Sequence, residues 1–189
     1  MDLTAFRYGS IGSLFTVCAC IFSPASANDV EANPFARFVG IWKLKDDLFQ
    51  QVWDGETVET LTIPNHRTDC GPINTNGSAL CVVDAGDIKG HILWAFDQHT
   101  HTFGHLSHFG AARMGRGTGA IGPDDMLRIE IRFSDEPARH YRIYTYEWKS
   151  ADEYKMISRQ YDAADVPTGN WYGGTFVRVK NNESASNQN

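Results

Sequence analysis

The chain has 189 residues, with 17 Lys or Arg against 23 Asp or Glu, so its formal net charge at pH 7 is -6. Non-specific binding to nucleic acid depends on a basic face, so this charge balance argues against nucleic acid as a partner. Hydrophobic residues make up 42% of the chain, and its length suits one domain that can bury a core.

The N-terminal segment has the features of a removable signal peptide over residues 1–27. Residues 11–22 carry no charge, and this run is shorter than the roughly 20 apolar residues that a membrane span needs. Small residues follow in Ser23-Pro24-Ala25-Ser26-Ala27, at the positions that signal peptidase reads. We therefore expect cleavage after Ala27, a periplasmic or secreted domain over residues 28–180 and a disordered polar tail over residues 181–189. A buried N-terminal helix is the alternative.

The four cysteines form two pairs with different roles. The run Val17-Cys18-Ala19-Cys20 loosely fits a lipoprotein acylation box, so a lipid-anchored form is a second alternative. Cys70 and Cys81 belong to the mature domain and bracket the turn-rich residues 71–78. An even pair in an exported chain predicts one disulfide that closes a surface loop, with two free buried thiols as the alternative.

The mature chain has β patterning after one short helical turn. Asn33-Pro34 begins this turn, with Pro at the first helical position, and Gly40 ends it. Ten strand candidates follow, separated by turn signals such as Asp54-Gly55. These candidates cover residues 41–53, 57–63, 79–83, 88–96, 100–109, 112–120, 126–133, 139–148, 154–161 and 171–179.

Alternation within the strands indicates their pairing. Leu127, Ile129, Ile131 and Phe133 are apolar, and the residues between them are charged, so this strand has one buried and one solvated face. Consecutive hairpins of this kind are typical of antiparallel sheets, and a closed barrel leaves no exposed edges. We expect an all-β fold, a single antiparallel up-and-down β-barrel of about ten strands.

Short motifs near the two ends of the domain carry a family resemblance. Phe38-Val39-Gly40-Ile41-Trp42 leads from the helical turn into the first strand through Gly-x-Trp, and the last strand ends in Thr175-Phe176-Val177-Arg178. This pattern resembles the calycin superfamily, the lipocalins and their relatives. The resemblance implies that Trp42 closes one end of the barrel and that Arg178 lies over its ring.

The order of motifs narrows this resemblance. The run of residues 90–97 and the closing Gly-Gly-Thr-Phe-Val-Arg are similar to a bacterial calycin-like group of unknown function, the DUF1579-like proteins. The chain departs from true lipocalins in lacking their mid-chain motif and in its disulfide. The ligands of lipocalins are therefore not expected ligands of this chain.

Histidines are concentrated in one short stretch that contains His99, His101, His105 and His108. In an extended strand, the side chains of His101 and His105 lie on one face and that of His108 on the other. His101 and His105 are therefore the candidate metal ligands, although no carboxylate falls within the cluster. The alternatives are partly exposed histidines, or histidines that hydrogen-bond a ligand in a pocket. No histidine is marked as a haem ligand, and we expect no cofactor.

A polar and aromatic cluster lies on the later strands. Its members are Arg128, Arg132, Arg142, Tyr144, Tyr146, Trp148 and Arg159. If this face points inward, it forms a cavity with cationic and phenolic groups, suited to an acidic amphipathic ligand. If it points outward, it is a solvated face with cross-strand pairs.

We expect a barrel that binds a small, largely apolar or acidic amphipathic ligand in its interior. The candidate ligand-binding residues are Trp94, Phe96, Phe103, His105, Arg113, Arg116, Tyr144 and Tyr146. One alternative is a lyase, isomerase or hydrolase at the barrel mouth, with His105 or His108 as general base and Arg113 or Arg116 binding an anionic substrate. A third hypothesis is an interaction module whose exposed aromatic patch binds another protein.

Overall fold

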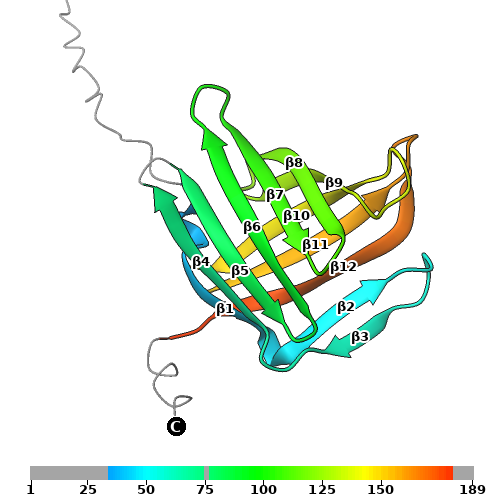
Figure 1. Ribbon diagram of the computed structural model, residues 1–189, viewed down its shortest axis with the longest axis horizontal. Coiled ribbons are helices and arrows are strands. Elements are labelled where there is room, and N and C mark those ends of the chain that lie inside the picture. Colours follow the sequence, from blue (N-terminus) through cyan, green and yellow to red (C-terminus); the bar gives the residue numbers. More distant parts are fainter. Residues whose placement is uncertain (1–33, 75–76, 181–189) are drawn as a thin grey trace, which may run out of the picture. The chain divides into compact units, whose positions relative to one another are not determined.

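A computed structural model describes residues 34–74 and 77–180 (Figure 1). The predicted signal peptide, its cleavage site, the alternative acylation box and the predicted polar tail all lie outside the described residues. None of the described helices is long and apolar enough to cross a membrane.

The described residues form strands joined by short turns, with two single-turn 3-10 helices near the start. In chain order, the elements are η1 (Pro34–Arg37), β1 (Gly40–Leu44), η2 (Lys45–Asp47), β2 (Leu48–Val52), β3 (Glu59–Thr62), β4 (Arg67–Asn74), β5 (Ser78–Ala85), β6 (Ile88–Asp97), β7 (Thr102–Phe109), β8 (Arg113–Ile121), β9 (Leu127–Phe133), β10 (Tyr141–Ser150), β11 (Glu153–Tyr161) and β12 (Pro167–Arg178).

Ten of these strands close into an antiparallel barrel, as the sequence predicted. β4 to β12 pair in chain order, and β1 closes the ring because it pairs with both β4 and β12. Within β1, Trp42 is opposite Thr68 on one side and Arg178 on the other. The predicted alternation holds along β9, where Leu127, Ile129, Ile131 and Phe133 are buried and the residues between them are exposed.

The expected strand over residues 41–53 is broken in two. Asp46 and Asp47 each have a φ of 56°, and this left-handed backbone cannot continue a strand. β2 therefore leaves β1 and pairs further along β12, where Val52 lies opposite Trp171, and then pairs with β3. The β2–β3 hairpin extends the wall of the barrel beyond the ten-strand ring (Figure 1).

The prediction missed β4 because Gly71-Pro72 looked like part of a turn. These two residues lie in the strand, opposite Leu80 and Ala79 of β5. Cys70 and Cys81 are directly opposite each other and form a disulfide. Both cysteines are buried, so the bridge joins two strands inside the barrel rather than closing a surface loop.

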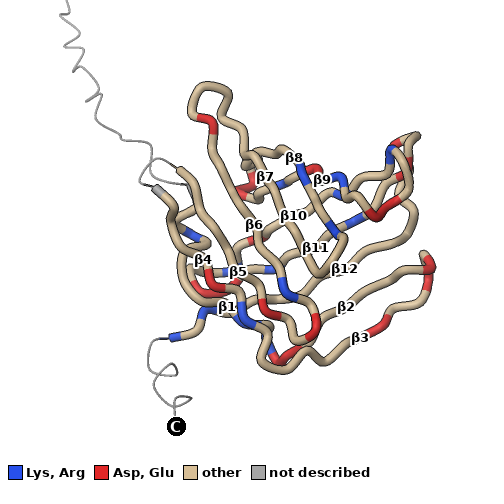
Figure 2. Tube along the Cα trace, viewed as in Figure 1, with Lys and Arg blue, Asp and Glu red and all other residues tan. Residues whose placement is uncertain are grey.

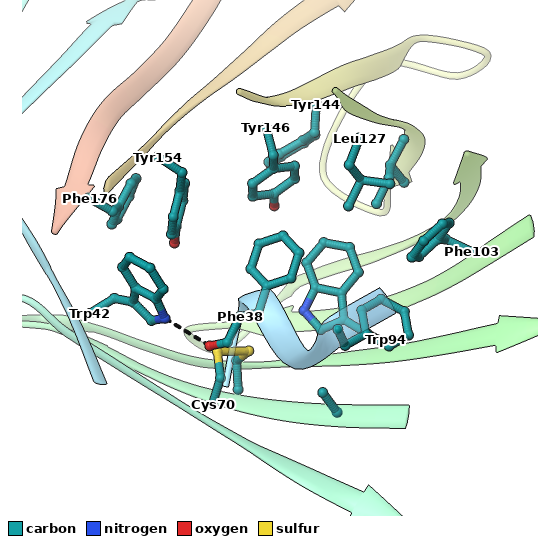
Figure 3. Close-up of a cluster of buried hydrophobic side chains, with 14 of the residues drawn as sticks. Phe38, Trp42, Cys70, Trp94, Phe103, Leu127, Tyr144, Tyr146, Tyr154 and Phe176 are labelled. Atoms are coloured by element: carbon teal, nitrogen blue, oxygen red, sulfur yellow. Dashed lines mark hydrogen bonds between the residues drawn. A yellow bond between two sulfur atoms is a disulfide. The ribbon is translucent and has the colours of Figure 1, made fainter. Parts of the chain in front are cut away.

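One end of the barrel, here called the closed end, is filled by η1 and Trp42 (Figure 3). Phe38 stacks on Trp94 at 5.3 Å between ring centroids, and the Trp42 indole donates a hydrogen bond of 2.8 Å to the Phe38 carbonyl. The Arg178 guanidinium lies 4.2 Å from the Trp42 ring centroid, the arrangement that the calycin resemblance implied. The opposite end, with the β5–β6, β7–β8 and β9–β10 turns, is here called the mouth.

Glycines on β8 let this strand approach β9 closely. A Cβ atom on Gly117 would lie 1.8 Å from the Glu130 carbonyl oxygen, and one on Gly119 would lie 2.0 Å from that of Arg128. No side chain fits at such distances, so these glycines serve tight packing of the barrel wall.

Candidate ligand-binding cavity

A cavity of about 410 Å³ lies inside the barrel between two facing walls. The β4–β6 wall contributes Thr68, Cys70, Cys81, Val83, Ile92 and Trp94. The β10–β12 wall contributes Tyr144, Tyr146, Tyr154, Met156, Tyr172 and Phe176. Phe38 forms the floor at the closed end, and Trp53, Ile88, Phe109, Arg113 and Asp135 line the mouth side. The walls are therefore mainly aromatic and aliphatic, with few polar groups.

The inward-facing tyrosines act as neutral groups. Tyr144, Tyr146 and Tyr154 are buried, and desolvation raises the pKa of each phenol above its usual value. The hydroxyl groups of Tyr144 and Tyr172 share a hydrogen bond across the wall. These side chains therefore offer aromatic surface and hydroxyl groups to a bound molecule, and none of the three is a base near neutral pH.

Arg113 joins two acidic residues at the mouth. Its Nη1 donates to both carboxylate oxygens of Asp135 at 2.7 Å, and its Nη2 donates to Glu136 at 3.0 Å and to the Tyr172 hydroxyl at 3.4 Å. The guanidinium also lies 3.8 Å from the Phe133 ring centroid. Arg113 is thus fixed at the rim, with Asp135, whose side chain is 41% exposed, on its solvent side.

Arg142 is the most unusual polar group near the cavity, because its side chain is completely buried. Its Nε donates to Glu136, and its guanidinium lies 5.0 Å from the Trp53 ring centroid and 4.7 Å from that of Tyr172. Within the described residues, both Nη groups of Arg142 and Oε2 of Glu136 lack a hydrogen-bond partner. Buried polar groups normally have partners, so this site contains donors that a ligand or water could use.

The structure brings together only part of the predicted ligand-binding set. Trp94, Tyr144, Tyr146 and Arg113 line the cavity. Phe103 packs at the closed end against Phe35 and Phe96, and neither Phe96 nor Phe103 lines the cavity. Arg116 and His108 are exposed on the outer face because they fall between the inward positions of β8 and β7.

The predicted pairing of His101 with His105 is wrong. β7 begins at Thr102, so His101 lies in the preceding turn with a φ of 53° and is exposed. His105 is buried, with its ring 4.9 Å from Trp94 and 6.5 Å from Tyr144. Across the described part of the chain, no three His, Cys, Asp or Glu side chains are grouped so that they could hold a metal ion.

His105 is nevertheless chemically unusual. Neither ring nitrogen has a hydrogen-bond partner within residues 34–74 and 77–180. Desolvation lowers its pKa to about 4, so the ring is neutral at physiological pH. It does not line the cavity, and Trp94 and Tyr144 are its cavity-lining neighbours.

Four residues at the mouth were missed by the sequence interpretation, namely Trp53, Asp135, Glu136 and Tyr172. They come from the bend after β2, the β9–β10 turn and β12, which are far apart in the chain and meet only after the barrel closes. The sequence contains no local signal for this juxtaposition.

Comparison with known proteins adds little to this description. No protein-family model matches the chain, and no curated protein matches it. The chain is similar to the solved structure of EF1p2_mFAP2b bound to DFHBI, with 13% identity and a TM-score of 0.36, over 78% of this chain and 98% of that chain. It is also similar to a protein of unknown function from the DUF3598 family of Nostoc punctiforme, with 9% identity and a TM-score of 0.21, over 78% of this chain and 98% of that chain. Likenesses this weak support no conclusion about function, and the DUF1579-like resemblance stays a prediction.

Proposed function

We propose that this barrel binds a small, largely apolar ligand with one acidic group in its interior. The observation that carries the proposal is the cavity of about 410 Å³ between aromatic and aliphatic walls. Its size falls in the range of roughly 300 to 1,000 Å³ that is usual for small-molecule sites. Burial of the ligand's apolar body against Ile92, Trp94 and Met156 would provide most of the affinity.

The polar groups near the mouth support an acidic group on the ligand. Arg142 does not line the cavity itself, but it lies against Trp53 and Tyr172, which do, and the described residues leave its two Nη groups without partners. A ligand carboxylate would accept charge-assisted hydrogen bonds from such donors. The ligand carboxylate could also take the place of the partly exposed Asp135 carboxylate as the ion-pair partner of Arg113, so that the Arg113 charge would stay paired.

We further propose that the protein acts outside the cytoplasm, as a calycin-like barrel of the DUF1579-like kind. The disulfide between Cys70 and Cys81 supports an oxidising compartment, since such bridges are rare where thiols are kept reduced. N-terminal sequencing of the protein from its host tests this proposal. Asn28 as the first residue is expected, and a retained Met1 would contradict export. A chain that begins at an acylated Cys20 would instead contradict only cleavage after Ala27, because it is an exported lipid-anchored form.

The geometry gives less support to an enzyme at the mouth. His108 and Arg116 are on the outer face, so neither can act in the cavity. His105 is opposite Gly117, four residues along β8 from Arg113, which corresponds to roughly 13 Å. The candidate base and the candidate anion-binding arginine therefore do not meet around one substrate.

The large exposed hydrophobic side chains are mostly aliphatic, with Trp53 as the aromatic exception, so the aromatic patch expected for a protein-interaction module is not formed among the described residues.

A matched pair of fluorescent probes tests the proposed function. 1-Anilinonaphthalene-8-sulfonate is apolar with one anionic group, and N-phenyl-1-naphthylamine is its neutral analogue. We expect both probes to bind with a rise in fluorescence, and Val83→Trp, which fills the cavity, to weaken both by roughly tenfold or more. Val82→Trp is the control, because Val82 is 46% exposed on the outer face of the same strand. Equal effects of the two substitutions would refute the cavity as the binding site.

A double substitution tests the acidic group separately. Arg142→Met with Glu136→Gln removes the buried charge pair without leaving a lone charge. We expect it to weaken the anionic probe by roughly tenfold and to leave the neutral probe nearly unchanged. If both probes weaken equally in a variant whose thermal unfolding is unchanged, the ligand's acidic group is not bound here.

A further inference from the structure

A row of metal-binding side chains crosses three neighbouring strands on the outer face of the barrel. His91 of β6 is directly opposite His108 of β7, and His108 is directly opposite Met114 of β8. These residues are separated in the sequence and become neighbours only through the pairing of the sheet. None of them belongs to the cavity described above.

The alternation of each strand directs all three side chains outward. Their neighbours Gly90, Ser107 and Gly115 are buried on the inner face. His91 and His108 are exposed, and Met114 is 54% exposed. Within the described parts of the chain, none of the three side chains has a hydrogen bond or an ion pair, so their nitrogen and sulfur atoms are not committed to the fold.

The spacing allows one ion to reach all three side chains. Residues directly opposite each other in an antiparallel sheet have Cβ atoms roughly 4.5 to 5.5 Å apart. An ion above His108 therefore has His91 on one side and Met114 on the other, each one strand away. Imidazole and thioether side chains are long enough to bridge this lateral distance.

The surroundings select the kind of ion. The next residue in the row beyond His91 is Val82, and Leu106 lies beside His108 on β7. Two cations, Lys89 and Arg116, lie two residues from His91 and Met114 on the same face. Figure 2 shows that β7 carries no acidic or basic residue and that the charged residues of β6 lie near its ends. Magnesium, calcium and manganese prefer oxygen ligands, whereas a thioether is a soft ligand that suits copper(I).

We propose that His91, His108 and Met114 bind one copper(I) ion on the outer face of the barrel. This site has two imidazole ligands and one thioether ligand, a donor set distinct from the Cys, His and carboxylate ligands that hold zinc. The site is separated from the cavity by the barrel wall, so copper binding is independent of the ligand-binding proposal.

Competition for copper(I) tests the site. The protein, purified in the form that its host produces, is titrated anaerobically with copper(I) and ascorbate against the chromophoric chelator bicinchoninate. One copper(I) per chain is expected, with affinity reduced by roughly tenfold or more in His91→Gln, His108→Gln and Met114→Leu. His99→Gln and Met126→Leu are the matched controls, since both residues lie elsewhere on the barrel and should leave the affinity unchanged.

Two further measurements make the result decisive. X-ray absorption of the copper-loaded protein should show one sulfur and two imidazole neighbours, and Met114→Leu should lose the sulfur signal. Zinc binding should be weak and insensitive to Met114→Leu, because the thioether is a poor ligand for that ion. Copper(I) affinity equal in all five variants, or sulfur retained in Met114→Leu, overturns the proposal.

Discussion

Two arginines stack on tryptophan rings at opposite ends of this barrel, and their hydrogen bonding differs. At the closed end, Arg178 uses all of its nitrogens, with bonds to Asp152 and to the carbonyls of Val39, Arg37 and Ala151. Toward the mouth, Arg142 is more deeply buried, yet among residues 34–74 and 77–180 only its Nε has a hydrogen-bond partner. The closed end is therefore a completed structural element, whereas the interior toward the mouth contains polar groups for which the described residues provide no partner.

The largest expected effect concerns His105, another buried side chain for which the described residues provide no hydrogen-bond partner. Its folded pKa of about 4 lies below the ordinary value of 6.5, so the unfolded chain binds a proton first as pH falls. Stability is thus fully present above pH 6.5 and is lost between pH 6.5 and 4, by about 3 kcal/mol in total. Urea unfolding at a series of pH values measures this slope.

The control for this prediction is His105→Gln, which should remove most of the slope. His66 keeps a smaller contribution of the same sign, because burial also lowers its pKa. An unchanged slope in His105→Gln would show that His105 has a partner in solution, such as a buried water, and would weaken the contrast between the two ends.

The next largest expected effect is the loss of stability when Arg178 is removed from the closed end. Arg178→Met keeps apolar contact with Trp42 but leaves three backbone carbonyls without a donor. We expect a loss of about 2 kcal/mol in the free energy of unfolding, measured by urea denaturation. The matched control is Arg132→Met, because Arg132 also lies over a ring, Tyr141, but on the exposed surface. A change there within about 0.5 kcal/mol is expected.

The smallest effect on stability is expected for the charge pair near the mouth. Arg142→Met with Glu136→Gln removes both members of a buried ion pair whose hydrogen bonds are incompletely satisfied. Replacing both members of such a pair often changes the free energy of unfolding little. We expect a change in the free energy of unfolding within about 1 kcal/mol, together with the weaker binding of the anionic probe described above. A loss as large as that of Arg178→Met would mean that the pair is structural, and the two ends would then differ less than we infer.

The sequence predicted the fold well where a strand has one solvent-exposed face and one buried face. β9 has strict alternation from Leu127 to Phe133, and its bounds agree with the prediction to within one residue. β4 was missed because the composition of Gly71-Pro72 is typical of a turn. These two residues instead lie in a strand, next to the disulfide that joins β4 to β5. The break between β1 and β2 depends on the left-handed backbone of Asp46 and Asp47. The strand-like pattern on both sides of these residues gave no sign of that break.

The candidate site was harder to predict because it is assembled from both ends of the chain. Tyr144 and Tyr146 share the inward face of β10, which is one of the two orientations that the sequence left open. Trp53 and Tyr172 reach Arg142 only after β12 has paired with β2. The relation between His91 and His108 likewise depends on the register of β6 with β7, and a single-residue slip would separate them.

The seam of the barrel has a consequence for how the protein is made. β1 and β12 are joined by only three opposed pairs, from Trp42 with Arg178 to Leu44 with Phe176, and these residues lie near opposite ends of the described chain. Contacts between such distant segments are slow to form because the loop between them must be closed first. During synthesis the ring cannot close until β12 has emerged from the ribosome, so no shorter nascent chain can form the closed barrel. Under the proposed export, this order of events would keep the barrel unclosed until the whole domain has been synthesised.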